Sequence, residues 1–388
     1  EFEGEWVASR LSEYLNESKE RNKKGHFNKT DVLSVSGDFG IVNQIELLGR
    51  SFAGASVLPY HIVRLGNIVY TKSPLKEYPY GIVKANTGKD GIVSTLYAVY
   101  SVKDNANYKF IEYYFSLANR ANRYFKPIVR IGAKHDMKIG NQEVLANQVI
   151  FPTVKEQEKI AGFLSLIDDR ISNQNKIIED LKKLKCAIIE NVLNNCHDNK
   201  MRLGDVGIYI RGLTYSSNDV VEQKGTIVMR SNNIVSGGLL DYCNNVVRVN
   251  KQILQEQQLQ NGDIVICMAN GSSALVGKTS FYDGKCLSPI TVGAFCGIYR
   301  SKMPITKWLF QTNRYHRYIW NSLQGGNGAI ANLNGEDILR MSFPTPDKST
   351  IGHCIKLLSS LDLLIENNVS LCSMFSQQKE YLLQQMFI

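Results

Sequence analysis

Phe151-Pro152-Thr153, followed by the apolar-periodic segment that starts at Leu164-Ser165-Leu166-Ile167-Asp168, decides the fold of this chain. The first motif returns 192 residues later as Phe343-Pro344-Thr345, and the second returns 194 residues later as Leu358-Ser359-Ser360-Leu361-Asp362. Half of the 388 residues is 194, so the sequence predicts two copies of one unit, each a globular region followed by a long helix. A period of this length excludes solenoid modules, which repeat every roughly 20 to 50 residues.

A third marker extends the repeat over the whole chain. Arg10-Leu11-Ser12-Glu13 returns after 192 residues as Arg202-Leu203-Gly204-Asp205. We therefore predict an α+β fold with an internal pseudo-two-fold, in which two mixed α/β domains alternate with two long antiparallel coiled-coil helices. The predicted segments are a first globular domain at residues 1–152, a first helix at 153–200, a second globular domain at 201–344 and a second helix at 345–388.

Apolar residues in both predicted helices recur at alternating steps of three and four positions, which is the pattern of a heptad seam. Gln174 and Asn368 interrupt the two seams at the same register, and so do Lys185 and Lys379. A polar residue in such a seam lowers stability but fixes register and partner. The apolar seam positions are Leu164, Ile167, Ile171, Ile178, Leu181, Leu358, Leu361, Ile365, Phe375 and Leu382.

The length of the two helices favours pairing between them. About 30 residues at 1.5 Å each make a rod of about 45 Å, which is longer than most helices that pack on a single domain. We expect an antiparallel pair that holds the two globular units at its opposite ends. The alternative is that each helix is amphipathic and lies only on its own domain.

Composition places the chain among globular proteins. Hydrophobic residues make up 44% of the sequence, which is enough for ordinary cores. No stretch approaches the roughly 18 apolar residues that span a bilayer, and the first residues lack a basic-then-apolar signal pattern. The eight cysteines form no C-x-x-C pair, so we expect free thiols and place the chain in the cytoplasm. Since the sequence does not begin with methionine, we also expect a short segment to precede it.

Charge points to a polyanionic partner. The net charge is +9 and the isoelectric point is about 9.0. Residues 109–138 carry seven Lys or Arg against Glu112 and Asp136, and residues 300–335 carry five and no acid. Both basic segments are interleaved with aromatic residues and lie at matching places in the two copies, just before the Phe-Pro-Thr motif.

No catalytic pattern holds. The segment from Gly271 to Thr279 is similar to a phosphate-binding loop, but five residues separate its glycines where the motif needs four. The sequence has no G-x-S-x-G, no H-E-x-x-H and no Asn- or Asp-Pro-Pro-Tyr or -Phe motif for base methylation. His135-Asp136 and Cys196-His197-Asp198 are isolated groupings that we interpret as surface or turn residues.

The residues that lead into the first predicted helix resemble those of a known protein family. Phe151-Pro152-Thr153-Val154-Lys155-Glu156-Gln157-Glu158-Lys159-Ile160-Ala161, continuing through Leu164 to Asp168, resembles the shared repeat region of type I restriction-modification specificity subunits. In that family a proline, then Glu-Gln-x-x-Ile-Ala, then Leu-x-x-x-Asp lead into the spacer helix. Phe2-Glu3-Gly4-Glu5-Trp6 is similar to the family's opening before its first recognition domain. The second copy departs from the motif, with Ser349-Thr350-Ile351-Gly352-His353-Cys354 in place of Glu-Gln-x-x-Ile-Ala.

The resemblance implies a non-catalytic DNA reader. The domains at 1–152 and 201–344 would be target-recognition domains that each read one half of a split, asymmetric site, and the helices would set the spacing. The partners implied are double-stranded DNA, two modification subunits and the restriction subunits. No cofactor is expected in this chain, while S-adenosylmethionine, ATP and Mg are expected on the partner subunits.

The resemblance and the basic segments together select candidate residues. The helix seam would supply the spacer and part of the partner-docking surface. An alternative is a protein-interaction scaffold whose coiled-coil helices are the functional surface, and a third is a nucleotide-hydrolysing enzyme that uses Lys278. The candidate DNA-binding residues are Arg120, Arg123, Lys126, Arg130 and Lys134 in the first domain and Arg314, Tyr315, Arg317, Asn327 and Asn332 in the second.

Overall fold

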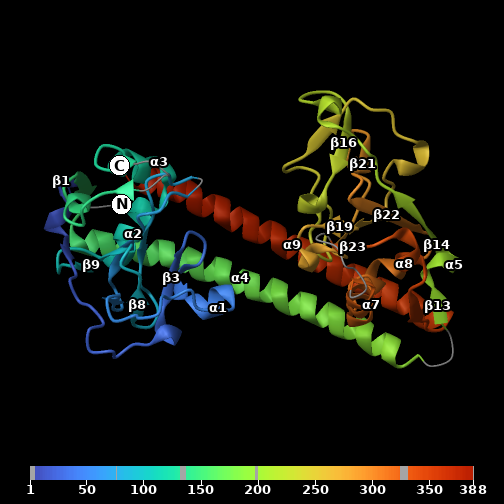
Figure 1. The fold of residues 1–388 in the computed structure, drawn as a ribbon, viewed down its shortest axis with the longest axis horizontal. Coiled ribbons are helices and arrows are strands. Elements are labelled where there is room, and N and C mark those ends of the chain that lie inside the picture. The colour runs from blue at the N-terminus through green and yellow to red at the C-terminus, as the bar shows by residue number, and fades with distance from the viewer. Residues whose placement is uncertain (1–4, 76, 132–136, 197–199, 324–330, 388) are drawn as a thin grey trace. The chain divides into compact units, whose positions relative to one another are not determined.

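The computed structural model describes residues 5–75, 77–131, 137–196, 200–323 and 331–387 (Figure 1). The chain forms two compact units. Unit 1 comprises Glu1–Asn175 and Ser370–Ile388, and unit 2 comprises Lys176–Val369. Each long helix therefore contributes one half to each unit. The α+β prediction is confirmed, since each unit combines short strands with these helix halves.

Unit 1 is built on a four-stranded antiparallel sheet with the order β2-β9-β6-β7. The central strands are apolar runs that the sheet buries on both faces, as Ile68, Val69 and Tyr70 show with exposures of 1% or less. A second pair, β1 with β12, closes the chain just before the first long helix. The four sheet strands are β2 (Leu15–Glu17), β9 (Ala98–Val102), β6 (Ile68–Tyr70) and β7 (Val83–Ala85).

Smaller elements surround this sheet. The helices α2 and α3 follow β9 and pack their aromatic residues into the core. The remaining helices and strands of unit 1 are β1 (Val7–Arg10), β3 (Leu33–Ser36), β4 (Gly40–Asn43), α1 (Gln44–Leu48), β5 (His61–Val63), β8 (Gly91–Val93), α2 (Tyr108–Ser116), α3 (Ala118–Phe125), β10 (Arg130–Ile131), β11 (Met137–Lys138) and β12 (Gln148–Phe151).

Unit 2 repeats the same sheet, with the order β14-β22-β18-β20 and every pair antiparallel. β13 pairs with β24 just before the second long helix, as β1 pairs with β12 in unit 1. A second sheet, β15-β17-β16-β21, contains a parallel pair, and its strand β16 is apolar and fully buried. The sheet strands are β14 (Gly207–Arg211), β15 (Val220–Val221), β16 (Thr226–Met229), β17 (Val247–Val249), β18 (Ile264–Cys267), β20 (Thr279–Phe281), β21 (Ile290–Val292) and β22 (Cys296–Ser301).

Short elements complete unit 2. The stretches at residues 108–125 and 306–323 each contain two helices, because the backbone is extended at Leu117 in unit 1 and non-helical residues follow Leu309 in unit 2. The remaining elements are β13 (Lys200–Arg202), α5 (Leu203–Val206), β19 (Ala269–Asn270), α6 (Thr306–Leu309), α7 (Asn313–Leu323), β23 (Ala331–Asn332), α8 (Gly335–Leu339) and β24 (Ser342–Pro344).

The turn before the third sheet strand shows the duplication in detail. Asn67 Oδ1 accepts a hydrogen bond from the Arg64 amide at 2.8 Å, and Asp263 Oδ2 accepts one from the Gln260 amide at 2.7 Å. Each turn places a glycine in the left-handed region, with φ of 81° at residue 66 and 90° at residue 262. The same local chemistry therefore starts β6 and β18, although most of the side chains around the two turns differ.

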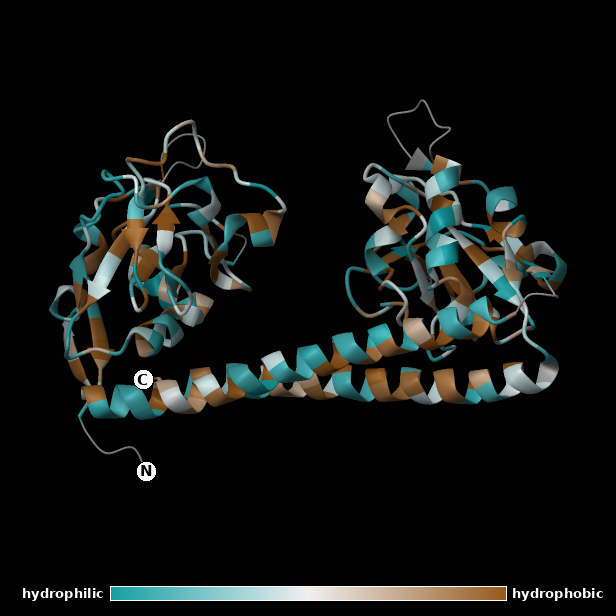
Figure 2. Cartoon of the chain, turned by 90° about the horizontal axis from the view of Figure 1, so that it is seen from below, coloured by the Kyte–Doolittle hydropathy of each residue, from teal (hydrophilic) through white to brown (hydrophobic). Residues whose placement is uncertain are grey.

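The long helices are α4 (Val154–Asn194), with 41 residues, and α9 (Lys348–Met386), with 39 residues. The expected length of about 30 residues was too short. That estimate counted only the seam from Leu164 and Leu358 onward and omitted the first turns, which begin at Val154 and Lys348 and pack on the globular parts. Figure 2 shows apolar residues concentrated on the strands inside each unit and recurring at intervals along both helices.

The two helix entries use different side chains. Gln157 is fully buried, and its amide donates to the Pro152 carbonyl at 2.9 Å while its Oε1 accepts from the Asn107 amide at 2.9 Å. The second copy lacks this glutamine, and there Asp347 Oδ1 accepts from the amides of Ser349 and Thr350 at 2.8 and 3.0 Å. Gln157 thus ties α4 to the loop before α2, whereas an aspartate cap starts α9.

Both helix ends belong to the cores of their units. In unit 1, Phe387 packs against Phe110 and Tyr114 with ring centroids 5.2 and 6.0 Å apart. In unit 2, Leu193 lies in one cluster with Trp308 and other apolar residues, and both are at most 4% exposed. Residues 193 and 387 are 194 positions apart, so equivalent ends of the two helices complete equivalent cores.

A buried histidine makes the stability of unit 1 depend on pH. His61 is 2% exposed, and burial, helped by the charges of Arg21 and Lys72 and opposed by Glu17, lowers its pKa from 6.5 to about 4. The unfolded chain then binds the extra proton between these values, so stability is lost as pH falls from 6.5 to about 4. We expect a loss of roughly 3 kcal/mol over the whole window.

Urea unfolding at a series of pH values checks this prediction. His61→Gln should remove most of the pH dependence in that window, whereas His26→Gln, which changes an exposed histidine, should leave it unchanged. Equal pH dependence in the wild type and His61→Gln would contradict it.

Candidate nucleic-acid interface

In unit 1 the basic candidates divide into a half-buried one, Arg120, and exposed ones. The guanidinium of Arg120 lies 5.0 Å from the Tyr114 ring centroid and 5.1 Å from that of Phe387, and it donates to the Phe387 carbonyl at 3.0 Å. Burial lowers the pKa of Arg120. This side chain therefore fastens α9 to α3 and is set aside from the interface. Arg123, Lys126 and Arg130 are exposed, and Lys134 lies outside the described residues.

The candidates in unit 2 divide in the same way. Tyr315 is fully buried, its hydroxyl donates to the Gly277 carbonyl at 2.7 Å, and burial raises its pKa. It is a core residue and is also set aside. Arg314 is half-buried and donates to the Ser342 carbonyl at 3.4 Å, while Arg317 and Asn332 are exposed. Asn327 lies outside the described residues.

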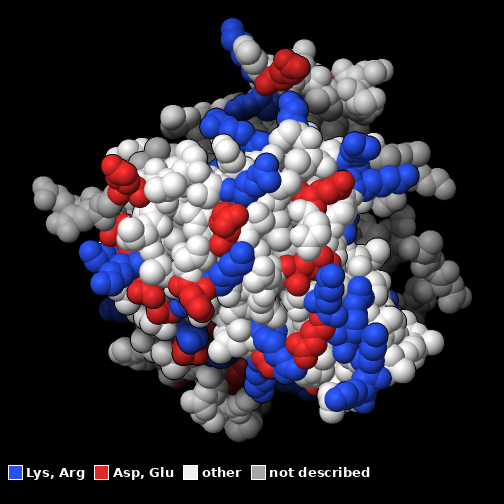
Figure 3. Space-filling view, turned by 90° about the vertical axis from the view of Figure 1, so that its left-hand side faces the viewer, with Lys and Arg blue, Asp and Glu red and all other residues white. Residues whose placement is uncertain are grey.

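A basic loop of unit 1 escaped the sequence analysis. It lies between β2 and the turn at Lys29–Asp31 and includes only one acid, Glu20, between residues 19 and 29. On the face shown in Figure 3, Lys and Arg side chains gather at the lower right with acidic residues beside them. This loop has no basic counterpart in the second copy, so it does not stand out from matching charge in the two copies. Its basic residues are Lys19, Arg21, Lys23, Lys24 and Lys29.

Unit 2 carries a pocket of ≈ 480 Å³ that the sequence analysis also missed. Three segments far apart in the chain form it, at residues 213–217, 230–232 and 293–296. Arg230, Asn232 and Phe295 are exposed at its walls. Burial raises the pKa of the Cys296 thiol to about 12, so this residue stays protonated at neutral pH and is a poor nucleophile.

The helix halves in unit 2 meet at a buried ion pair. Lys185 Nζ lies 2.8 Å from Asp362 Oδ1, and the two side chains are 6% and 7% exposed. Asp362 Oδ2 also accepts from Trp308 Nε1 at 3.0 Å and pairs with Lys307 Nζ at 2.7 Å. The aspartate on α9 thus holds three elements together, because α4 supplies Lys185 and α6 supplies both Lys307 and Trp308.

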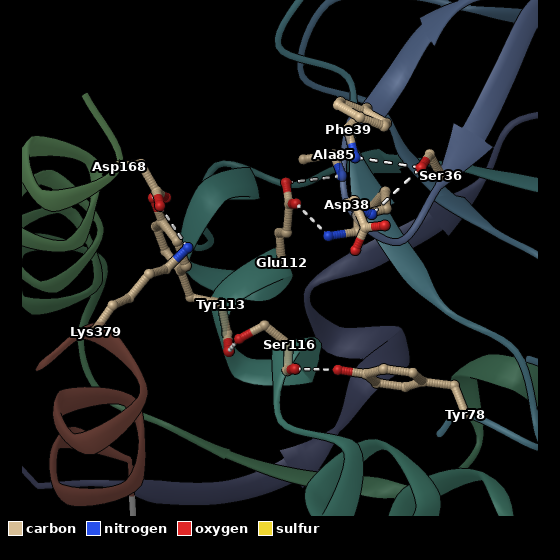
Figure 4. A network of polar contacts seen from close by, with 11 residues as sticks. Ser36, Asp38, Phe39, Tyr78, Ala85, Glu112, Tyr113, Ser116, Asp168 and Lys379 are labelled. Carbon is tan, nitrogen blue, oxygen red and sulfur yellow. Dashed lines mark hydrogen bonds and ion pairs between the residues drawn. The ribbon is translucent and has the colours of Figure 1, made fainter. Parts of the chain in front are cut away.

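Unit 1 has the equivalent ion pair with the copies exchanged. Lys379 Nζ lies 2.5 Å from Asp168 Oδ1, and the side chains are 25% and 39% exposed. The Tyr113 hydroxyl donates to Asp168 Oδ2 at 2.6 Å, and burial together with this hydrogen bond raises the pKa of Tyr113 (Figure 4). Residues 185 and 379, and likewise 168 and 362, are 194 positions apart. Each lysine therefore pairs with the aspartate of the other copy, as antiparallel packing of the two helices requires.

The ion pair of unit 1 borders a polar pocket of ≈ 530 Å³. Figure 4 shows the neighbouring network, in which Glu112 bonds to Lys84 Nζ at 3.3 Å and to the Ala85 amide at 3.1 Å. The Tyr78 hydroxyl donates to the Ser116 carbonyl. Two ion pairs at its lining, Lys84 with Glu112 and Lys379 with Asp168, join α2, β7 and the long helices at this pocket.

The predicted seam faces inward. Six of its ten apolar residues are buried and the other four are half-buried, namely Ile167, Ile171, Leu181 and Leu382. Other apolar residues of the helices stay exposed, including Leu166 at 68% and Leu363 at 58%. The heptad reading thus selected the packed side of each helix.

The described residues show no metal-holding group, and the segment from Gly271 to Thr279 does not fit a nucleotide phosphate. No group of three or more metal-ligating side chains occurs among them. The segment from Gly271 to Thr279 leads into β20 and not into a helix, so it lacks the helix N-terminus that a phosphate-binding loop uses. None of the described helices combines the length and the apolar character that crossing a membrane requires.

Comparison with solved structures places this architecture. No protein-family model matches the sequence, and no curated protein matches it. A type I restriction-modification system S subunit from M. genitalium is similar, with a TM-score of 0.58, 13% identity and coverage of 100% of this chain and 97% of that chain. The chain has the fold of a type I S subunit.

Two further structures match over the full length with lower scores. One comes from a study of complex assembly and conformational transition of the type I restriction-modification system, with a TM-score of 0.49, 13% identity and coverage of 99% and 98%. The other is the HsdS subunit from Thermoanaerobacter tengcongensis, with a TM-score of 0.37, 12% identity and coverage of 100% and 97%. The S-subunit fold agrees with the resemblance seen in the first helix entry.

Proposed function

We propose that this chain is the DNA specificity subunit of a type I restriction-modification complex. Unit 1 and unit 2 each read one half of a bipartite, asymmetric site, and α4 and α9 set the spacing between the halves. The observation that carries the proposal is the duplicated S-subunit fold, whose two copies share frame residues but present different surface side chains. A shared frame with two different surfaces suits two different half-sites.

The exposed cations support a nucleic-acid partner. Arg123, Lys126 and Arg130 in unit 1 and Arg317 in unit 2 are exposed, and Asn332 in unit 2 offers an exposed side-chain amide. Arginine and lysine contact phosphates, while arginine and asparagine also pair with base edges. The basic loop at residues 19–29 adds further phosphate contacts in unit 1.

The chemistry would belong to partner subunits. Two modification subunits, with bound S-adenosylmethionine, would dock partly on the seam-bearing helices and methylate adenine, and restriction subunits would use ATP and Mg. This chain would bind no cofactor and act in the cytoplasm. Exposed apolar residues of α4 and α9, such as Leu166 and Leu363, are suited to such docking.

Methylome sequencing of a host that expresses the modification subunits tests the proposal. A split adenine-methylated motif should occur only when this chain is also expressed, and the motif supplies both half-sites and their gap. Co-purification of the subunits is the control for assembly. If the assembled complex methylates no motif that depends on this chain, the DNA-reader assignment is wrong.

Salt dependence separates DNA binding from the scaffold alternative. With 6 to 10 phosphate contacts, affinity for a duplex that contains the motif should fall by about 10³- to 10⁵-fold between 50 and 200 mM salt. Association of the helices with a protein partner through apolar contacts should change far less over the same range. DNA affinity that is independent of salt would contradict the proposed phosphate contacts.

A further inference from the structure

The pocket of unit 2 has a rigid backbone frame. The Leu213 amide donates to the Val292 carbonyl at 2.7 Å, and the Gly293 amide donates to the Met229 carbonyl at 2.8 Å. A Cβ at Gly212 would lie 2.1 Å from the Gly293 carbonyl oxygen, so only glycine permits this approach. The three segments that form the pocket are therefore held to one another by main-chain contacts.

This frame presents an aromatic ring to solvent. Phe295 is 68% exposed, although its carbonyl accepts from the amides of Met268 and Ala269 at 2.8 and 3.1 Å. Its turn is closed by the Cys296 amide, which donates to the Gly293 carbonyl at 2.8 Å. A large apolar side chain held outward on a fixed backbone can bind a partner without further ordering of the main chain.

Two polar side chains beside the ring are largely unengaged. Arg230 is exposed and donates to the Asn245 carbonyl at 3.3 Å, and no acid of the described residues lies within ion-pair distance of it. Among the same residues, none hydrogen-bonds the side-chain amide of Asn232, which is also exposed. The turn between them is fixed, because Asn270 Nδ2 donates to Ser231 Oγ at 3.2 Å.

We propose that this pocket is the base-reading element of unit 2, in which Arg230 and Asn232 hydrogen-bond to base edges in the major groove and Phe295 makes an apolar contact with a base. The inference rests on the proposed function. A guanidinium pairs in two-pronged fashion with guanine and an amide pairs likewise with adenine, while an aromatic ring fits the methyl group of thymine. A rigid turn with these three side chains offers both hydrogen-bonding and apolar readout.

Unit 1 has a matching turn with a different side chain. Leu96 lies between β8 and β9, as Phe295 lies between β21 and β22, and it is also 68% exposed. The Tyr97 amide closes this turn by donating to the Ser94 carbonyl at 3.0 Å. The repeat thus holds an exposed apolar residue at one place in each unit, and its identity differs where the two half-sites must differ.

The test compares methylomes of complexes that contain Arg230→Ala, Arg230→Lys, Asn232→Ala or Phe295→Ala. Each variant should relax one or two positions of a single half-site, with discrimination reduced by about 5- to 150-fold, and should leave the other half unchanged. Leu96→Ala should affect only the opposite half. Arg340→Ala, which removes an exposed charge on α8 outside the pocket, should change neither half.

Arg230→Lys decides between a base contact and a phosphate contact. Lysine keeps the charge but cannot form the two-pronged pair, so a base reader loses discrimination and a phosphate contact does not. Uniformly weaker methylation with an unchanged motif in the Arg230 and Phe295 variants would overturn the inference while leaving the proposed function intact. A wild-type complex that directs no motif would instead overturn the proposed function.

Discussion

Replacing Asp362 by alanine should destabilise unit 2 by about 3 to 5 kcal/mol, because the change leaves a buried lysine without its counter-charge. Lys185 is 6% exposed and has Asp362 as its ion-pair partner at 2.8 Å. The same change removes the acceptor of Trp308 Nε1. Urea unfolding of the full chain, followed by hydrogen exchange resolved to unit 2, would measure the loss.

The repeat supplies a matched control for this prediction. Asp168→Ala removes the equivalent carboxylate in unit 1, where the side chains of the pair are 25% and 39% exposed and water can solvate Lys379. Its cost should be about 1 kcal/mol or less. The double variant Lys185→Met with Asp362→Leu should be more stable than Asp362→Ala alone. Equal losses from Asp168→Ala and Asp362→Ala would contradict the prediction.

Replacing Phe387 by alanine should destabilise unit 1 by about 3 to 5 kcal/mol through the cavity that it leaves. Phe387 is 4% exposed and its ring lies 5.2 Å from that of Phe110 and 6.3 Å from that of Trp6. Arg120 also loses the ring beneath its guanidinium. Hydrogen exchange should therefore rise in α2 and α3, which can be measured by mass spectrometry.

Two further variants test whether the effect of Phe387→Ala comes from the core of unit 1 or from any change on α9. Leu193→Ala, at the equivalent place in the other copy, should cost about 2 to 5 kcal/mol and act on unit 2 instead of unit 1. Tyr381→Ala lies on α9 but is 62% exposed, and it should change stability by no more than about 0.5 kcal/mol. If Phe387→Ala is as mild as Tyr381→Ala, the docking of α9 in unit 1 does not contribute as we expect.

The lysines of the helix seam could be located from the sequence, but their ion-pair partners could not. Lys185 and Lys379 interrupt the apolar seams of the two helices at the same position. Asp168 and Asp362 belong to the repeated motif that starts at Leu164 and Leu358. The reciprocal pairing was not predicted, because it depends on which turn of one helix lies beside which turn of the other. The structure gives that register. It also shows that each lysine in the seam is stabilised by an ion pair with an aspartate of the other helix.

The candidate interface depends on side-chain placement, which the sequence does not give. The basic segments interleaved with aromatic residues supplied Arg120 and Tyr315 as candidates, and both side chains are packed in the structure, because composition does not say which face of a short helix is buried. It missed the pocket that holds Arg230 and Phe295 because no single segment of sequence forms it.

The sequence by itself determined the duplication, the two helices and the side of each helix that packs. These features depend on local periodicity and on motifs that recur at a fixed offset, so they can be predicted without knowledge of distant contacts. Only the tertiary structure decided which polar groups meet and which side chains face solvent. Strand pairing brings residues 213, 230 and 295 to one pocket, and such long-range pairing is set by the whole core of a unit rather than by any one segment.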